Sequence, residues 1–313
     1  MYGNKLYLLV CTGRRFFLSS AVIIPTLFIL LYSSGFVGAK LGLPHAEPMT
    51  FLSLRFLIAA AALAIIATVV KAPWPESFSQ IKHQMITGIF LQAVFSIGVF
   101  CSLAIGLPPA ISGLIIALQP LIITMLMTTQ ASTRPDSKLI FASLLGLAGV
   151  ALTLAPGLAL SNGFSTTAVS LSVLGLMGLV AGNLLQKKHA NECHVLTAGV
   201  VQTLTAAVLS FVIAAFTETM TIDWTLNFTL ALFWMAILVS TGALSLFALM
   251  LKNQSADKVA QLFYLIPVIS GLLAWLMFDD QLTLLQSFGM AIVSASLYLA
   301  FSTPKRQTGK STA

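Results

Sequence analysis

The stretch EPMTFLSLRFLIAAAALAIIATVVK, Glu47 to Lys71, decides the fold class of this chain. From Met49 to Val70, every residue except Arg55 is apolar or carries a small hydroxyl group. A run of about 20 such residues is long enough to cross the roughly 30 Å of bilayer hydrocarbon. Because lipid offers the backbone no hydrogen-bond partners, such a run must be helical. The stretch therefore predicts a membrane-spanning helix with one arginine inside it.

The composition of the whole chain agrees with this interpretation. Of the 313 residues, 58% are hydrophobic and only 8% are charged, whereas soluble domains carry about 25% charged residues. The net charge of +7 is spread over short clusters between apolar runs, which is typical of membrane-flanking loops and not of a nucleic-acid-binding surface. We predict an all-α integral membrane protein with the lipid bilayer, and no nucleic acid, as a partner.

Hydropathy predicts ten spans separated by short connections. They lie near 18–39, 49–70, 85–106, 109–128, 138–156, 167–186, 195–216, 228–250, 258–278 and 284–302. Fourteen of the sixteen Lys and Arg residues fall on the side of the N-terminus. By the positive-inside rule, 1–17 is a cytoplasmic flank and 303–313 a cytoplasmic tail. This orientation places Arg55 roughly 8–10 Å below the outer mouth of its helix.

The two halves of the chain repeat each other with a shift of 147 residues. The coinciding pairs are Gly35 with Gly182, Lys40 with Lys187, Thr50 with Thr197, Arg55 with Gln202, and Pro120 with Pro267. Each predicted repeat, 18–156 and 167–302, holds five spans, and an odd number makes the two repeats insert in opposite orientations. Inverted repeats are typical of secondary transporters, whose substrate site lies at the repeat interface near the bilayer midplane.

Two quoted stretches resemble a known family. LYSSGFVGAKLGLPHAEPMTFLSLRF, Leu31 to Phe56, and FDDQLT, Phe278 to Thr283, are similar to the EamA family of the drug/metabolite transporter superfamily, as are the proline-bearing fourth and ninth spans. The resemblance implies a ten-helix carrier of the bacterial inner membrane that exports amino acids or other small metabolites by alternating access. Asp279 and Asp280 stand where that family commonly has Gly and Glu.

Polar side chains inside the spans are the candidates for the transport path, because a bundle interior tolerates them better than lipid does. The predicted substrate-binding residues are Tyr32, Arg55, Gln92, Ser96, Gln119, Asn183, Gln202, Gln261 and Tyr264. The alternative for the small residues is helix packing, and for the tyrosines it is filling of the core. Pro120 and Pro267 are predicted hinges, with a static kink as the alternative.

Arg55 has a functional and a structural interpretation. Its guanidinium could hold a carboxylate or phosphate through two parallel hydrogen bonds. Alternatively, it could extend outward to the interface, cap the carbonyls of a neighbouring helix, or pair with Glu47. The functional interpretation predicts an amino acid or a related carboxylate-bearing solute as the substrate.

The acidic residues argue against a proton-driven extruder of lipophilic cations, because none lies clearly within a predicted span. Uniport, or exchange driven by the gradient of the substrate, fits better, while a proton-coupled exporter of drugs or other small organic solutes is the alternative. A membrane-embedded enzyme is the alternative from another class, but no catalytic motif is present. His189 and His194 share a loop with Glu192 and could bind metal, yet a solvated basic loop is preferred. We therefore predict no enzyme, cofactor or metal site, and the oligomeric state stays open.

Overall fold

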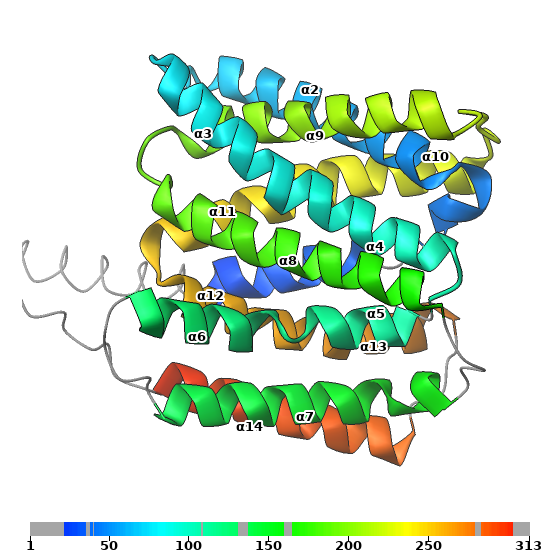
Figure 1. The fold of residues 1–313 in the computed structure, drawn as a ribbon, viewed down its shortest axis with the longest axis vertical. Helices are drawn as coiled ribbons and strands as arrows, with labels where there is room; N and C mark the ends of the chain where they lie inside the picture. The colour runs from blue at the N-terminus through cyan, green and yellow to red at the C-terminus, as the bar shows by residue number, and fades with distance from the viewer. Residues whose placement is uncertain are drawn as a thin grey trace, which may run out of the picture.

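The fold was taken from a computed structural model that describes residues 22–35, 38–39, 41–107, 109–130, 137–159, 165–278 and 283–302. The predicted flank 1–17 and tail 303–313 lie outside these residues, as do Lys40, Asp279 and Asp280. Within the described residues all regular secondary structure is helical (Figure 1), apart from one antiparallel bridge between Ala46 and Ile222. The structure thus confirms the predicted all-α class.

The α-helices of the described chain are joined by short segments. They are α2 (Pro48–Val69), α3 (Phe78–Gly88), α4 (Phe95–Ala104), α5 (Pro109–Ile116), α6 (Gln119–Gln130), α7 (Ser137–Ala159), α8 (Thr166–Lys188), α9 (Val195–Thr217), α10 (Leu226–Phe233), α11 (Leu244–Asn253), α12 (Ala256–Gln261), α13 (Leu265–Phe278) and α14 (Leu284–Ser302). An apolar helix, Val22–Gly35, precedes them. Two 3₁₀ turns, Leu43–His45 and Leu262–Tyr264, and two π-helical segments, Ile89–Val94 and Trp234–Ala243, complete the described elements.

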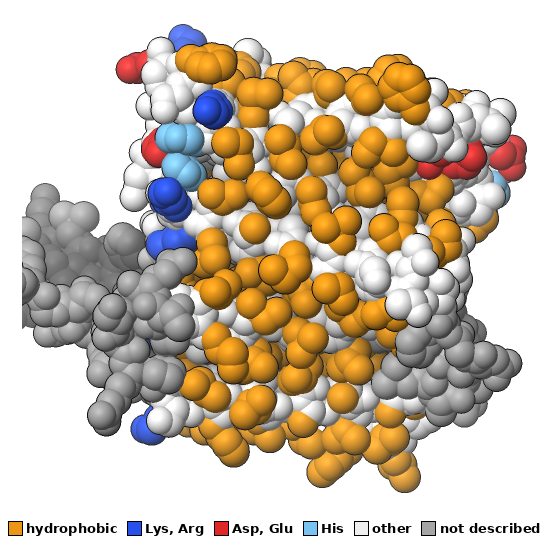
Figure 2. Space-filling view, in the orientation of Figure 1, with side chains coloured by type: hydrophobic (Ala, Val, Ile, Leu, Met, Phe, Trp, Pro, Cys, Tyr) orange, Lys and Arg blue, Asp and Glu red, His pale blue; other side chains and the backbone are white. Residues whose placement is uncertain are grey.

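Eight helices in the described residues are long and apolar enough to cross a membrane. Two shorter apolar helices, Val22–Gly35 and Ile111–Met127, fall inside the predicted spans 18–39 and 109–128. Figure 2 shows a broad hydrophobic belt across the visible face of the bundle, with Lys and Arg side chains along one edge of that face. The chain is therefore a multi-pass membrane protein, and its predicted count of ten spans stays a prediction.

The helices lie side by side in one bundle. α2 packs along α9 at one edge of the bundle, and α7 packs along α14 at the opposite edge (Figure 1). The end of α9 meets the start of α2, since the Glu218 carboxylate accepts hydrogen bonds from the backbone N–H groups of Met49 and Thr50, both at 2.7 Å. At the other end, the hydroxyl of Thr197 donates to the Pro73 carbonyl. α2 and α9, which the 147-residue shift superposes, therefore run antiparallel.

Helix interruptions also recur at matching places. The shift of 147 residues carries the π-helical segment 89–94 onto 236–241, inside the second π-helical segment. Pro120 follows the break between α5 and α6, and Pro267 follows the 3₁₀ turn Leu262–Tyr264. Proline lacks the backbone N–H that continues a helix and clashes with the preceding turn, so each proline sits in the first turn of a new helix. Both predicted hinges therefore coincide with real breaks, while their movement stays a prediction.

Close packing fixes the first π-helical segment against α8. A Cβ atom added at Gly182 would lie 2.4 Å from the Cα of Leu91, so only glycine lets the two backbones approach this closely. Gln92, the next residue, lies in the same segment and is held at a defined depth in the bundle.

Candidate functional site

A central cavity lies among the Val22–Gly35 helix, α2, the two π-helical segments, and helices α4, α8 and α11. Its volume is about 110 Å³. It is lined by Tyr32, Gly35, Ala39, Arg55, Phe56, Leu91, Gln92, Phe95, Ser96, Val99, Phe100, Leu103, Leu179, Met235, Val239, Ser240, Leu244, Phe247 and Phe263. Most of these side chains are aliphatic or aromatic, as in ligand pockets that place a few polar groups in an apolar wall.

Among the described residues of this wall, Arg55 alone carries a charge. It is buried, with 6% of its surface exposed, and its guanidinium carbon lies 4.4 Å from the ring centre of Phe56 and 5.7 Å from that of Phe100. Among the described residues it forms no ion pair, and its buried Nε has no hydrogen-bond partner. The guanidinium therefore lies against two aromatic rings, which stabilise its charge, and its Nε–H has no partner within the described part of the chain.

The structural alternatives for Arg55 find no support among the described residues. The Glu47 carboxylate is engaged elsewhere, since it accepts hydrogen bonds from the backbone N–H of Thr219 at 2.7 Å and of Met220 at 3.2 Å. Burial of the Arg55 side chain also argues against a guanidinium that extends outward to the membrane interface. The predicted alternative of an Arg55–Glu47 pair is not formed.

A second cavity adjoins the central cavity at one end of the bundle. It is wider, about 1060 Å³, and is lined by His45, Glu47 and Asp223 among others. Ala39 and Leu103 belong to the walls of both cavities. The central cavity thus adjoins an opening at the end that carries the start of α2.

The opposite side of the central cavity is closed by amides. The side-chain nitrogen of Gln202 donates to the side-chain oxygens of Gln84 and Gln186, both at 2.7 Å. All three side chains are buried. Gln92 and Ser240 line both the central cavity and a small void of about 10 Å³ that also touches Gln202. These contacts put the Gln84–Gln186–Gln202 cluster directly beyond the closed end of the cavity.

Four predicted site residues come together in the wall of the central cavity, namely Tyr32, Arg55, Gln92 and Ser96. Gln202 lies in the amide cluster described above. Pro267 lines a neighbouring cavity that shares Tyr32 with the central one.

The other predicted site residues lie elsewhere in the bundle. Gln119 and Asn183 are fully buried, and their amide groups have no partner among the described residues. Gln261 donates to the Ser143 hydroxyl at 2.8 Å, and the Tyr264 hydroxyl donates to the Ser143 carbonyl at 2.8 Å. These two side chains face α7 and do not line the central cavity.

Sequence reasoning missed two groups of residues. The aromatic wall around Arg55, formed by Phe56 and Phe100, was not singled out because only polar residues were treated as a signal. Gln84 was also missed, although an amide just inside an apolar run marks a buried partner, because unpaired amides are costly in hydrocarbon.

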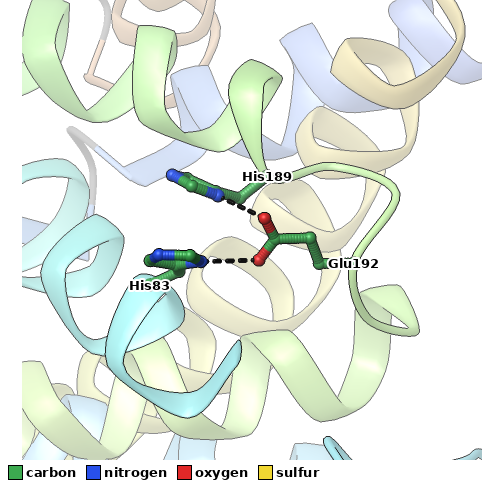
Figure 3. A group of neighbouring side chains, drawn as sticks. All are labelled: His83, His189 and Glu192. Carbon is green, nitrogen blue, oxygen red and sulfur yellow. Dashed lines mark hydrogen bonds and ion pairs between the residues drawn. The ribbon is translucent and has the colours of Figure 1, made fainter. Parts of the chain in front are cut away.

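A cluster of two histidines and one glutamate lies at the end of the bundle where α3 begins and α8 ends. His83 on α3 and His189 at the end of α8 both direct Nδ1 at the carboxylate of Glu192 (Figure 3). Hydrogen bonds from His189 and then from His83 lower the pKa of Glu192 below its usual range, because they stabilise its ionised form. His194, the other histidine of this loop, instead caps α9 by accepting from the backbone N–H of Leu196.

Comparisons with known proteins agree with this architecture. The chain is 24% identical over 295 residues to an Escherichia coli K12 protein named "Probable amino-acid metabolite efflux pump", covering 88% of this chain and 93% of that one. It is 23% identical over 291 residues to the "Uncharacterized transporter YvbV" of Bacillus subtilis 168, covering 89% and 90%. A solved structure described only as "Crystal structure of protein" has the same fold, with a TM-score of 0.75, 20% identity, and coverage of 90% of this chain and 97% of that one.

The same repeat that the shift of 147 residues reveals is found by family comparison. The EamA-like transporter family matches the chain twice, over residues 19–155 and 166–302. The two matches together cover far more than half of the 313 residues. This chain belongs to the EamA-like transporter family.

Proposed function

We propose that this transporter exports a small carboxylate-bearing metabolite, an amino acid with an apolar side chain, across a bacterial inner membrane by alternating access. The observation that carries the proposal is Arg55, a buried cation with no partner carboxylate among the described residues, in the wall of an apolar cavity. A buried charge is expensive without a counter-charge, and a substrate carboxylate would supply one during each transport cycle.

The remainder of the cavity wall sets the expected size and polarity of the substrate. Phe56, Phe100, Met235 and Val239 would surround an apolar side chain next to the carboxylate. Gln92 and Ser96 offer neutral hydrogen-bonding groups on the π-helical segment and α4. Because the free volume is small, only about 110 Å³, a compact metabolite suits it better than a bulky drug.

The arrangement of openings supports alternating access. The cavity adjoins an opening at the end with Glu47 and Asp223 and is closed by the amide cluster at the other end. The positive-inside rule assigns the end with the wider cavity to the outside, which supports our proposal that this conformation faces outward. Antiparallel α2 and α9, and helix breaks at matching places in the two halves, support two inverted five-helix repeats that exchange roles between the two conformations.

Efflux from cells tests the proposal. Cells that overproduce the transporter are loaded with a panel of amino acids and small organic acids, and export is compared with the Arg55→Gln variant at equal membrane abundance. We expect faster efflux of carboxylate-bearing solutes, and loss of this efflux in the variant. Export by the variant at the parental rate would contradict a role of Arg55 in the path.

Proton coupling is the alternative within the same class of transporter. The described wall of the central cavity contains no Asp or Glu, and Glu47 lies in the outer opening. Without a carboxylate beside the substrate, we propose uniport or exchange. Transport that stops when the pH gradient is collapsed would instead favour proton coupling through Glu47 or another loop carboxylate.

A further inference from the structure

We propose that His83, His189 and Glu192 bind one divalent transition-metal cation, of the Zn²⁺ type, at the end of the bundle opposite the outer opening. His83 lies on α3, whereas His189 and Glu192 lie three residues apart at the end of α8 and in the α8–α9 loop, more than 100 residues further along the chain. Their ligand atoms all lie within 4.8 Å of one another. Figure 3 shows the two imidazole rings stacked beside each other and the carboxylate facing both.

The distances between the ligand atoms fit a site for one metal ion once the side chains rotate. His83 Nδ1 lies 2.9 Å from one Glu192 oxygen, and His189 Nδ1 lies 2.7 Å from the other. Around Zn²⁺, bond lengths of about 2.0–2.2 Å place tetrahedral ligands roughly 3.3 Å apart. This separation lies between the two short contacts and the 4.8 Å limit. Because the imidazole ring centres lie 4.1 Å apart with planes at 28°, one ring must turn out of the stack so that both Nδ1 atoms face the cation.

The donor set selects the class of metal. Two imidazole nitrogens and one carboxylate oxygen match Zn²⁺ and its neighbours, whereas Ca²⁺ and Mg²⁺ prefer sets made of oxygen alone. Three protein ligands leave a fourth position for water. His189 is buried, but the His83 and Glu192 side chains are 35% and 32% exposed, and this exposure provides an entry path.

The positively charged side chain of Lys187, two residues before His189, binds groups outside the site. The Lys187 ammonium donates to the carbonyls of Leu251 and Gln254, at 2.7 and 2.6 Å. It is therefore engaged with the end of α11. The cluster joins α3, in the first matched repeat, to the α8–α9 loop of the second, so the bound cation fixes the contact between the two halves at this end.

The alternative is a triad held only by hydrogen bonds, in which both Nδ1–H groups donate to the carboxylate. Substitution by cysteine separates the two interpretations. His83→Cys keeps a metal-binding side chain but loses the imidazole hydrogen bond. His83→Gln retains hydrogen-bonding capacity and lacks the ligand nitrogen. Metal binding by the cysteine variant and not by the glutamine variant is expected only of a metal site.

The test is calorimetric titration of the purified, tag-free full chain in detergent with Zn²⁺ alone. We expect about one Zn²⁺ per chain, at least a tenfold loss of affinity in His83→Gln and Glu192→Gln, and recovered binding of Zn²⁺ or Cd²⁺ in His83→Cys. His45→Gln is the matched control, because His45 pairs with a single carboxylate, Asp223, at 3.1 Å. It should bind Zn²⁺ as the parent does.

Thermal melting of the same samples supplies a second measurement. Zn²⁺ should raise the melting temperature of the parent and of His45→Gln, because a ligand that binds only the folded state stabilises it. His83→Gln should melt cooperatively and show no such rise. The proposal is overturned if the parent binds Zn²⁺ no more tightly than His83→Gln, or if His45→Gln loses binding to the same extent. None of these outcomes depends on the transported substrate.

Discussion

Replacing Arg55 by glutamine should weaken substrate binding and leave the empty protein at least as stable as before. A hydrogen bond to a charged partner contributes about 1.5–3 kcal/mol, and a guanidinium makes two such bonds to one carboxylate. Glutamine keeps one neutral donor, so we take the net loss as about 3 kcal/mol. This energy corresponds to roughly a 100-fold rise in Kd.

The effect on stability has the opposite sign. In the empty cavity the guanidinium is buried and lacks a counter-charge among the described residues, which costs several kcal/mol. Cation–π contacts with the rings of Phe56 and Phe100 offset about 1–2 kcal/mol of this cost. Removing the charge relieves the remainder, so the melting temperature of Arg55→Gln should equal or exceed that of the parent.

The assay is binding of a radiolabelled apolar amino acid to purified protein, with melting followed on the same samples. Arg55→Lys should bind with intermediate affinity, because lysine keeps the charge and loses the planar pair of donors. Ser210→Ala, a buried change on α9 outside the central cavity, serves as the control and should bind as the parent does. Parental affinity in Arg55→Gln, or a marked fall in its melting temperature, would show that Arg55 is not an unpaired cation that binds the substrate carboxylate.

Three further substitutions test the architecture around the cavity. Gln202→Leu leaves two buried amide oxygens without their donor, so the free energy of unfolding, followed by melting, should fall by about 1–2 kcal/mol. An unchanged melting temperature would contradict a tight amide cluster. Gly182→Ala would place a Cβ 2.4 Å from the Leu91 Cα and should lower the yield of folded protein, whereas Gly113→Ala, whose Cβ would lie 3.4 Å from the nearest atom, should be tolerated. Glu218→Ala removes the cap of α2 and should cost about 1–3 kcal/mol by melting, while exposed Glu76→Ala should not.

The sequence predicted the helical class and most of the spans, because lipid leaves the chain few alternatives and apolar length is a direct signal. The repeat could also be predicted, since Pro120 and Pro267 mark breaks at matching places. The π-helical segments could not be predicted. They depend on which backbones approach each other, as Leu91 and Gly182 do, and periodicity alone does not contain that information.

The candidate site was predicted only in part. Arg55 stood out because a charge inside an apolar run is costly, and Gln92 stood out as an unpaired amide. The wall that determines the size of the cavity is apolar, and Phe56 and Phe100 look the same in sequence whether they face lipid, core or substrate. The cluster of His83 with Glu192 joins a residue of α3 to a residue of the α8–α9 loop, and a single sequence does not reveal such contacts.

Counterflow into proteoliposomes measures directly whether Arg55 recognises the carboxylate of the transported substrate. Purified transporter is reconstituted, and uptake of labelled phenylalanine is compared with uptake of phenethylamine, the same molecule without its carboxylate. We expect saturable exchange of phenylalanine that is lost in Arg55→Gln, and little exchange of the amine in either protein. Exchange of the amine as fast as the amino acid, unaffected by Arg55→Gln, would contradict the account.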